Sequence, residues 1–156
     1  MSIEDTNKFE SREQITETVR LQRDLSGADL SGLDLSGIKL TGLRMEGANL
    51  SETNLENAVL AANNMAGVNL TAAQLNEAQI AAANMSGASL SGAQLRDAKI
   101  IAVNLENADL TETDLTGSKW FAVNVSGADF SDVTTADAHA AGVDSVSYTH
   151  LTLPTN

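Results

Sequence analysis

The sequence of 156 residues contains no cysteine and one proline, and 3% of its residues are aromatic. Without cysteine, the chain can form neither a disulfide framework nor a cysteine-ligated metal site. No apolar run approaches the roughly 18 residues that span a membrane, and residues 1–5 lack the basic start and apolar stretch of a secretory signal. These absences predict a cytoplasmic protein that does not associate with a membrane.

Basic residues are also scarce, with 9 Lys and Arg against 21 Asp and Glu, which gives a formal net charge of −12 at pH 7. A chain of this charge repels phosphate, and this disfavours direct binding of nucleic acid. Before the last few residues, His139 is the sole histidine, and no motif pairs a nucleophile with a base. The sequence therefore predicts no enzyme, no cofactor and no metal site.

The dominant feature that is present is a period of five. An apolar residue stands at every fifth position from Leu25 to Phe130, which makes 22 consecutive positions without an exception. A second, mostly small residue such as Ala28 or Ala108 lies two positions before most of them. Neither an amphipathic helix nor an alternating strand has this period, so the pattern indicates a different repeating structure.

The repeated unit reads A-(D/N)-L-x-x, as in GADLS at 27–31 and NADLT at 107–111. This pattern resembles the pentapeptide-repeat family, and the resemblance covers about 110 of the 156 residues. The resemblance implies an all-β fold, a right-handed four-sided (quadrilateral) parallel β-helix in which each pentad forms one side. The large central residue and the small residue two positions before it would both point inward, and 20 residues would make one coil.

A second period of 20 residues supports such coils independently of the family. The segments 60–65, 80–85, 100–105 and 120–125 match one another better than they match their neighbours, as stacked coils require. The 22 pentads give about 5.5 coils and a rod about 26 Å long at a strand spacing of about 4.8 Å. Two columns follow from this alignment: buried methionines at 45, 65 and 85, and an asparagine ladder at 64, 84, 104 and 124.

Three segments are expected along the chain. Residues 1–23 form an N-terminal tail and a short helix that covers the first coil, because Ser11 to Gln14 has the spacing of a capping box. Residues 24–143 form the pentapeptide-repeat β-helix, although the pentads loosen after Asp132. Residues 144–156 resemble a translated sequencing-adapter peptide, so this tail is expected to be artefactual and disordered, and Tyr148 and His150 carry no functional weight.

The four-sided fold sorts the charged residues, because every fourth pentad lies on the same side of the rod. The side centred on Leu30 and its successors, here named the acidic side, carries six acids and no base: Asp29, Glu52, Asp109, Glu112, Asp129 and Asp132. The opposite side, centred on Leu40 and its successors and here named the lysine–apolar side, carries no acid. Its candidate contact residues, beside Lys39, are Val59, Ala61, Ala81, Lys99, Ile101, Lys119 and Phe121.

Two hypotheses for function follow from these sides, together with the plainer reading that the acids only keep the rod soluble. The first is a non-enzymatic scaffold that binds a protein partner, or a second copy of itself, through the lysine–apolar side. The alternative is DNA mimicry, because the acidic side resembles that of the quinolone-resistance members of the family, which occupy the DNA-binding groove of gyrase. Duplex DNA carries about 15 charges over 26 Å, which is clearly more than this side carries.

Overall fold

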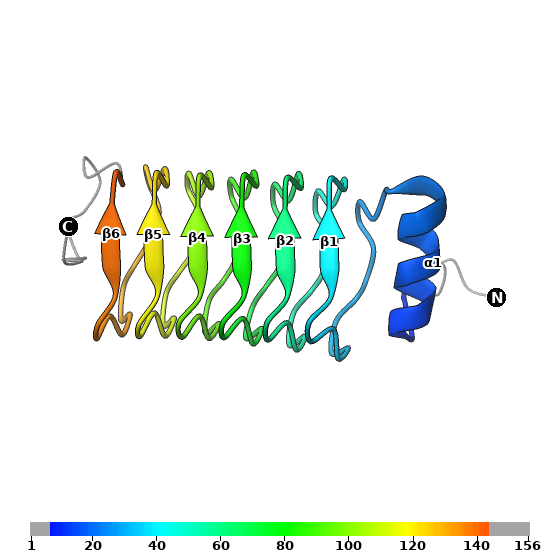
Figure 1. Ribbon diagram of the computed structural model, residues 1–156, viewed down its shortest axis with the longest axis horizontal. Helices are drawn as coiled ribbons and strands as arrows, with labels where there is room; N and C mark the ends of the chain where they lie inside the picture. Colours follow the sequence, from blue (N-terminus) through cyan, green and yellow to red (C-terminus); the bar gives the residue numbers. More distant parts are fainter. Residues whose placement is uncertain (1–6, 144–156) are drawn as a thin grey trace.

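The computed structural model describes residues 7–143, which form one helix followed by a stack of six short strands (Figure 1). The strands pair in chain order in a single parallel sheet, β1-β2-β3-β4-β5-β6. The elements are α1 Arg12–Gln22, β1 Lys39–Thr41, β2 Val59–Ala61, β3 Gln79–Ala81, β4 Lys99–Ile101, β5 Lys119–Phe121 and β6 His139–Ala141.

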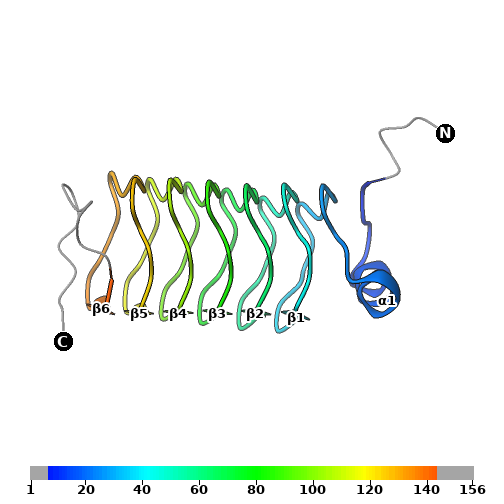
Figure 2. The same ribbon diagram turned by 90° about the horizontal axis from the view of Figure 1, so that it is seen from above.

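From Asp24 onward the paired residues lie 20 positions apart, so one coil of the chain takes 20 residues. Leu40 pairs with Leu60 in the sheet, and isolated parallel bridges such as Asp24 to Arg44, Asp29 to Asn49 and Asp34 to Asn54 make the other three sides. Viewed from above, the coils follow one another at even intervals along the rod (Figure 2). The predicted four-sided parallel β-helix is confirmed, with five full turns between β1 and β6.

The core consists of the predicted inward residues. The central residues of the pentads are buried from Leu25 to Phe130, and Met45, Met65 and Met85 pack inside as expected. Four inward positions, however, hold buried polar residues that an apolar pattern does not detect: Thr53, Asn63, Thr113 and Ser118. Each of them bonds to a backbone carbonyl, because a buried polar group without a partner would destabilise the fold.

The Asp or Asn of the repeat has a local role in the turns. Its side-chain oxygen accepts a hydrogen bond from the N–H two residues later, as from Ser51 to Asn49 at 3.0 Å and from Thr111 to Asp109 at 2.9 Å. On the side of Asn64 the amides also form the predicted ladder from Asn64 to Asn104, because Asn84 donates to Asn64 and Asn104 donates to Asn84. The A-(D/N)-L motif is thus explained by turn geometry as well as by core packing.

The helix α1 covers the N-terminal end of the stack (Figure 1). Ser11 Oγ accepts the N–H of Gln14 at 3.2 Å, which is the first of the two bonds of the predicted capping box. Gln14 Oε1 accepts the N–H of Glu10 at 2.7 Å rather than that of Ser11, and Ile15 is fully buried. Arg12 and Arg23 donate to backbone carbonyls of the first coil, at 2.6 and 2.8 Å. The segment before α1 also pairs with this coil, so the predicted cap is confirmed.

At the other end the β-helix continues through β6 to the last described residues. The strand β6 pairs with β5 in the same register as the strands before it, and Val133 and Val143 pack against the core. The predicted artefactual tail at 144–156 and the first residues of the predicted N-terminal tail lie outside the described residues. Within residues 7–143, no helix has the length and apolar character to cross a membrane.

Candidate interaction surfaces

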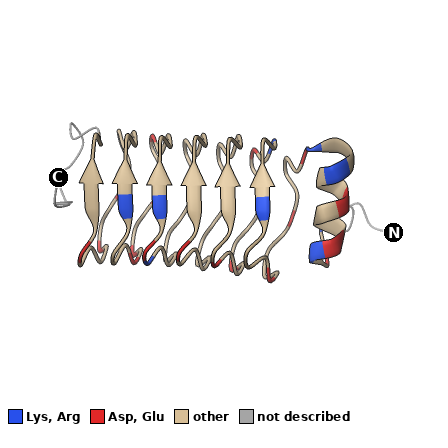
Figure 3. Cartoon of the chain, in the orientation of Figure 1, with Lys and Arg blue, Asp and Glu red and all other residues tan. Residues whose placement is uncertain are grey.

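The lysine–apolar side lies on the six-stranded sheet, and each strand presents two outward residues there. The first residue of each strand forms one row: Lys39, Val59, Gln79, Lys99, Lys119 and His139. The third residue forms a second row: Thr41, Ala61, Ala81, Ile101, Phe121 and Ala141. Figure 3 shows lysines on β1, β4 and β5 and no acidic residue on any of the six strands.

The structure brings the predicted apolar contact residues together. Ile101 and Phe121 are direct neighbours on β4 and β5, and their exposed fractions are 43% and 58%. Among the described residues, Leu21 on α1 is the one other large apolar side chain with comparable exposure. Trp120, which lies between Lys119 and Phe121, points inward and is buried. Two large apolar side chains therefore stand side by side on a flat sheet.

The apolar surface continues past the strands, which the sequence reasoning missed. The residue after β2, β3, β4 and β5 is an exposed alanine in each case, and these four residues are named the alanine corner: Ala62, Ala82, Ala102 and Ala122. Their φ angles lie between 52° and 57°, a region that favours glycine or asparagine. Four successive alanines at strained turn positions were the signal that could have revealed this edge.

The lysines of this side form no ion pair within residues 7–143. The ion pairs there are Arg20–Glu17 at 2.7 Å, Arg44–Asp24 at 3.9 Å and Arg96–Asp114 at 3.1 Å, and none lies on the sheet. On the flank away from the alanine corner, a shallow groove of about 410 Å³ runs beside the lysine row. Its lining includes the acids Glu77 and Asp97 and the bases Lys99 and Lys119.

The acidic side is not a continuous wall of charge. Asp29, Asp109 and Asp129 belong to one column, but Asn49, Asn69 and Ser89 fill the positions between them. Glu52, Glu112 and Asp132 occupy the turns, with φ between 58° and 60°. The coils centred on Leu70 and Leu90 carry no acid on this side. The six carboxylates thus form one group near the N-terminal end and another near the C-terminal end, with about 14 Å of neutral surface between them.

Three of these carboxylates also stabilise turns. Asp29 accepts hydrogen bonds from the Ser31 hydroxyl at 2.6 Å and from the Ser31 N–H at 3.0 Å. These two bonds, of which the hydroxyl bond has the larger effect, hold the pKa of Asp29 below its usual value because they favour the charged form. Asp109 and Asp129 accept equivalent N–H bonds. These three carboxylates therefore stabilise the fold as well as contributing negative charge to the surface.

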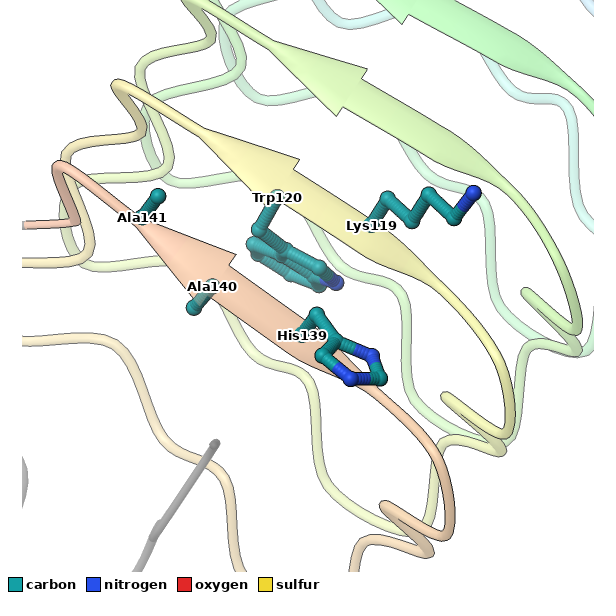
Figure 4. Close-up of a pocket in the computed structure, with 5 residues that line it drawn as sticks. All are labelled: Lys119, Trp120, His139, Ala140 and Ala141. Carbon is teal, nitrogen blue, oxygen red and sulfur yellow. The ribbon is translucent and has the colours of Figure 1, made fainter. Parts of the chain in front are cut away.

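A second groove, of about 420 Å³, lies where β5 and β6 meet (Figure 4). The buried indole of Trp120 forms one wall, and its Nε1–H donates to Ser118 Oγ at 2.8 Å. Lys119 and His139 are its titratable residues, and no group of three His, Asp or Glu side chains suited to a metal ion occurs within residues 7–143. The ring nitrogen Nδ1 of His139 lies 2.9 Å from the carbonyl oxygen of Asp137.

The fold and its repeat define a class of protein, the parallel β-solenoids. The family profile described as pentapeptide repeats matches with 8 copies, in overlapping segments at 24–57, 39–75, 53–92, 78–117 and 93–134. These segments span well over half of the chain, so the protein belongs to the pentapeptide-repeat family. Proteins of this family are generally non-enzymatic repeat proteins.

Solved structures agree with this assignment. The chain is similar to the pentapeptide repeat protein Rfr23 of the cyanobacterium Cyanothece 51142, with 18% identity, a TM-score of 0.58, and coverage of 86% of this chain and 97% of that one. It is also similar to a pentapeptide repeat protein of the Arabidopsis thaliana thylakoid lumen, with 30% identity, a TM-score of 0.55, and coverage of 69% and 71%.

A third similar structure is QnrB1, described as a plasmid-mediated fluoroquinolone resistance protein. It is 16% identical, with a TM-score of 0.46 and coverage of 83% of this chain and 78% of that one, so the likeness carries no functional information. No curated protein matches the sequence.

Proposed function

We propose that this pentapeptide-repeat protein is a non-enzymatic scaffold that binds a protein partner through its lysine–apolar side. The observation that carries the proposal is the exposure of Ile101 and Phe121, in register on adjacent strands of a flat sheet. Neighbouring exposed apolar side chains on an otherwise polar surface often mark a contact with another chain. The unpaired Lys99 and Lys119 beside them supply a charged border, as interfaces commonly have.

The test is a double substitution, Ile101→Glu with Phe121→Glu. Both side chains point away from the core, so the variant should fold, while its charged face should no longer bind. Sedimentation velocity and the set of proteins that co-purify from a lysate of the source organism should both be compared with wild type. If neither changes, the side is not an interface.

A matched control keeps the charge change and moves it to the neighbouring side. Ala66→Glu with Ser86→Glu adds two acids on adjacent coils, in the column where Glu46 and Glu106 already stand. This control should behave like wild type in both measurements. A loss in both variants would point to net charge rather than to the face.

The alternative function, DNA mimicry toward gyrase, would use the acidic side. In its favour, Asp109, Glu112, Asp129 and Asp132 gather on two adjacent coils. Against it, the neutral coils between the two acidic groups interrupt the regular charge spacing that a duplex presents. If the protein mimics DNA, purified protein should inhibit ATP-dependent supercoiling. Neutralising the four carboxylates of the C-terminal group should then abolish the inhibition. Absence of inhibition at micromolar protein would remove this function.

A further inference from the structure

We infer that the partner of the lysine–apolar side is a short acidic segment of another protein, with apolar residues on the edge that meets the alanine corner. This inference rests on the proposed function and specifies the chemistry of its partner. Across the side, the lysine row comes first, then the row with Ile101 and Phe121, then the alanine corner. A matching segment would carry acids along one edge and apolar side chains along the other.

Charge complementarity identifies the acidic edge of the partner. The six strands carry Lys39, Lys99 and Lys119 and no acid, although the whole chain has a net charge of −12. None of these lysines has a carboxylate partner within 4 Å among the described residues. An acidic segment would pair with them, whereas a basic one would meet repulsion along this row.

The size of the side indicates a segment rather than a folded domain or a second copy. Six strands at a spacing of about 4.8 Å cover about 24 Å, and the two outward rows lie about 7 Å apart. The area is a few hundred Å², compared with about 800 Å² that each partner contributes to a standard interface. A single helix, about 10 Å in diameter, covers this width.

The shape of the apolar rows gives the segment a position along the rod. Ala61 and Ala81 on β2 and β3 present only methyl groups, and Ile101 and Phe121 rise beside them on β4 and β5. The alanine corner continues this low surface without charge. A large apolar side chain of the partner would rest on the methyl groups and contact Ile101 from the side. This contact would bury a part of the Ile101 side chain that is now exposed.

An anionic membrane surface offers similar chemistry but fits the flanks less well. Glu77 and Asp97 line the groove beside Lys99 and Lys119, on the flank away from the alanine corner. A broad, flat layer of negative headgroups would lie against these two carboxylates as well as against the lysines. A narrow segment that covers only the lysine row and the apolar rows avoids them.

The experiment uses a display library of random peptides of about 16 residues, long enough to cover 24 Å as a helix. Wild-type protein is the bait, and the Ile101→Glu, Phe121→Glu variant removes peptides that bind elsewhere. The enriched peptides should be acidic and should contain leucine, isoleucine or aromatic residues. Their affinity should fall about tenfold or more for Lys99→Glu with Lys119→Glu, because two charge pairs become repulsive.

A matched control separates this effect from net charge. Lys8→Glu with Arg20→Glu makes the same change in charge on the N-terminal segment and on α1, and should leave the affinity within about twofold of wild type. Added salt should weaken the wild-type affinity more than that of the Lys99→Glu, Lys119→Glu variant.

Three results would overturn the inference. Enriched peptides that are neutral or basic would contradict the acidic partner while leaving the proposed interface intact. Failure to enrich any peptide that depends on Ile101 and Phe121 would also reject a linear segment, and the sedimentation test of the Ile101→Glu, Phe121→Glu variant would then decide on the proposed function separately. Flotation of the protein with phosphatidylserine vesicles, lost in the Lys99→Glu, Lys119→Glu variant, would assign the side to a membrane surface.

Discussion

The lysine–apolar side and the acidic side are built from the same pentad, yet they differ in backbone and in surface. On the acidic side, the residue before the central one is Asp or Asn except at Ser89, and coils are joined there by single bridges. The Asp or Asn side chain accepts an N–H two residues later. On the lysine–apolar side that position holds Lys, Val, Gln or His, and three residues of each coil pair as a strand. The position before the central residue therefore sets the turn of a side, and it supplies three of the six acids of the acidic side.

The largest effect is expected from substitutions in the core, which both sides share. Leu50 belongs to the acidic side and Leu60 to the lysine–apolar side, and both are fully buried. Substitution of either by alanine should lower the free energy of unfolding by about 2–5 kcal/mol, because each leaves a cavity in the same core. Urea unfolding followed by circular dichroism would measure this. A difference of more than a factor of two between them would show that the two walls of the core are not equivalent.

A smaller effect is expected at the corner where the lysine–apolar side ends, because a buried side chain there bonds to the preceding coil. The buried amide of Asn63 accepts the N–H of Leu43 and donates to the carbonyl of Leu40, each at 2.8 Å. Asn63→Ala should cost about 1–3 kcal/mol, because both backbone groups lose a partner inside the protein. The control is Asn104→Ala, in the partly exposed ladder, with an expected loss of about 1 kcal/mol or less. Equal losses in urea unfolding would contradict the role of Asn63.

The turn residues of the two sides should respond in opposite directions. Gly92, on the acidic side, has a φ of 71°, and beyond its chain neighbours no atom lies within 4 Å of the place that a Cβ would take. Gly92→Ala should therefore destabilise by about 0.5–1 kcal/mol through backbone strain alone. Ala102, with φ of 55°, carries that strain already, so Ala102→Gly should be neutral or stabilise by a similar amount. Thermal unfolding would report both, and a destabilising Ala102→Gly would reject this account of the alanine corner.

The smallest effect is a dependence on pH that belongs to the acidic side. The folded-state pKa of Asp29 is lowered, so its contribution to stability is present above the unfolded pKa of about 3.9 and is lost as the pH falls through the folded pKa. Asp29→Asn keeps the turn bond but cannot titrate, and should flatten the stability profile below about pH 4. Comparison of the two unfolding curves at each pH is the measurement. Parallel curves would contradict the role of the Ser31 bonds.

The sequence predicted most of the fold because each coil repeats the same geometric requirement. Regular burial of Leu, Met and Ile at a spacing of five has few solutions, and the capping-box residues of α1 follow local rules that do not depend on the rest of the fold. Thr53, Thr113 and Ser118 escaped detection because each bonds to the carbonyl three residues earlier, which an apolar pattern does not encode. Asn63 escaped detection because it bonds to a carbonyl 23 residues earlier, which only the coiled chain brings near.

The candidate surfaces were predictable in part. The assignment of Ile101 and Phe121 to one outward row needed only the period of 20, and the structure places them there. The alanine corner was missed although its alanines recur every 20 residues, because their exposure depends on the turn geometry that follows each strand. The contact role of the lysine–apolar side stays a prediction, since it depends on a partner outside this chain.

The bonds from Arg12 and Arg23 have a consequence for assembly. In later coils, the carbonyls equivalent to those of Ser36 and Thr41 accept backbone N–H groups, as Glu56 does from Gly37 and Ala61 does from Gly42. At the first coil, the two guanidinium groups take the place of that missing backbone. In the language of polymers, α1 is a chain stopper: it ends a repeat that has no intrinsic end, so the rod cannot grow by stacking at this face.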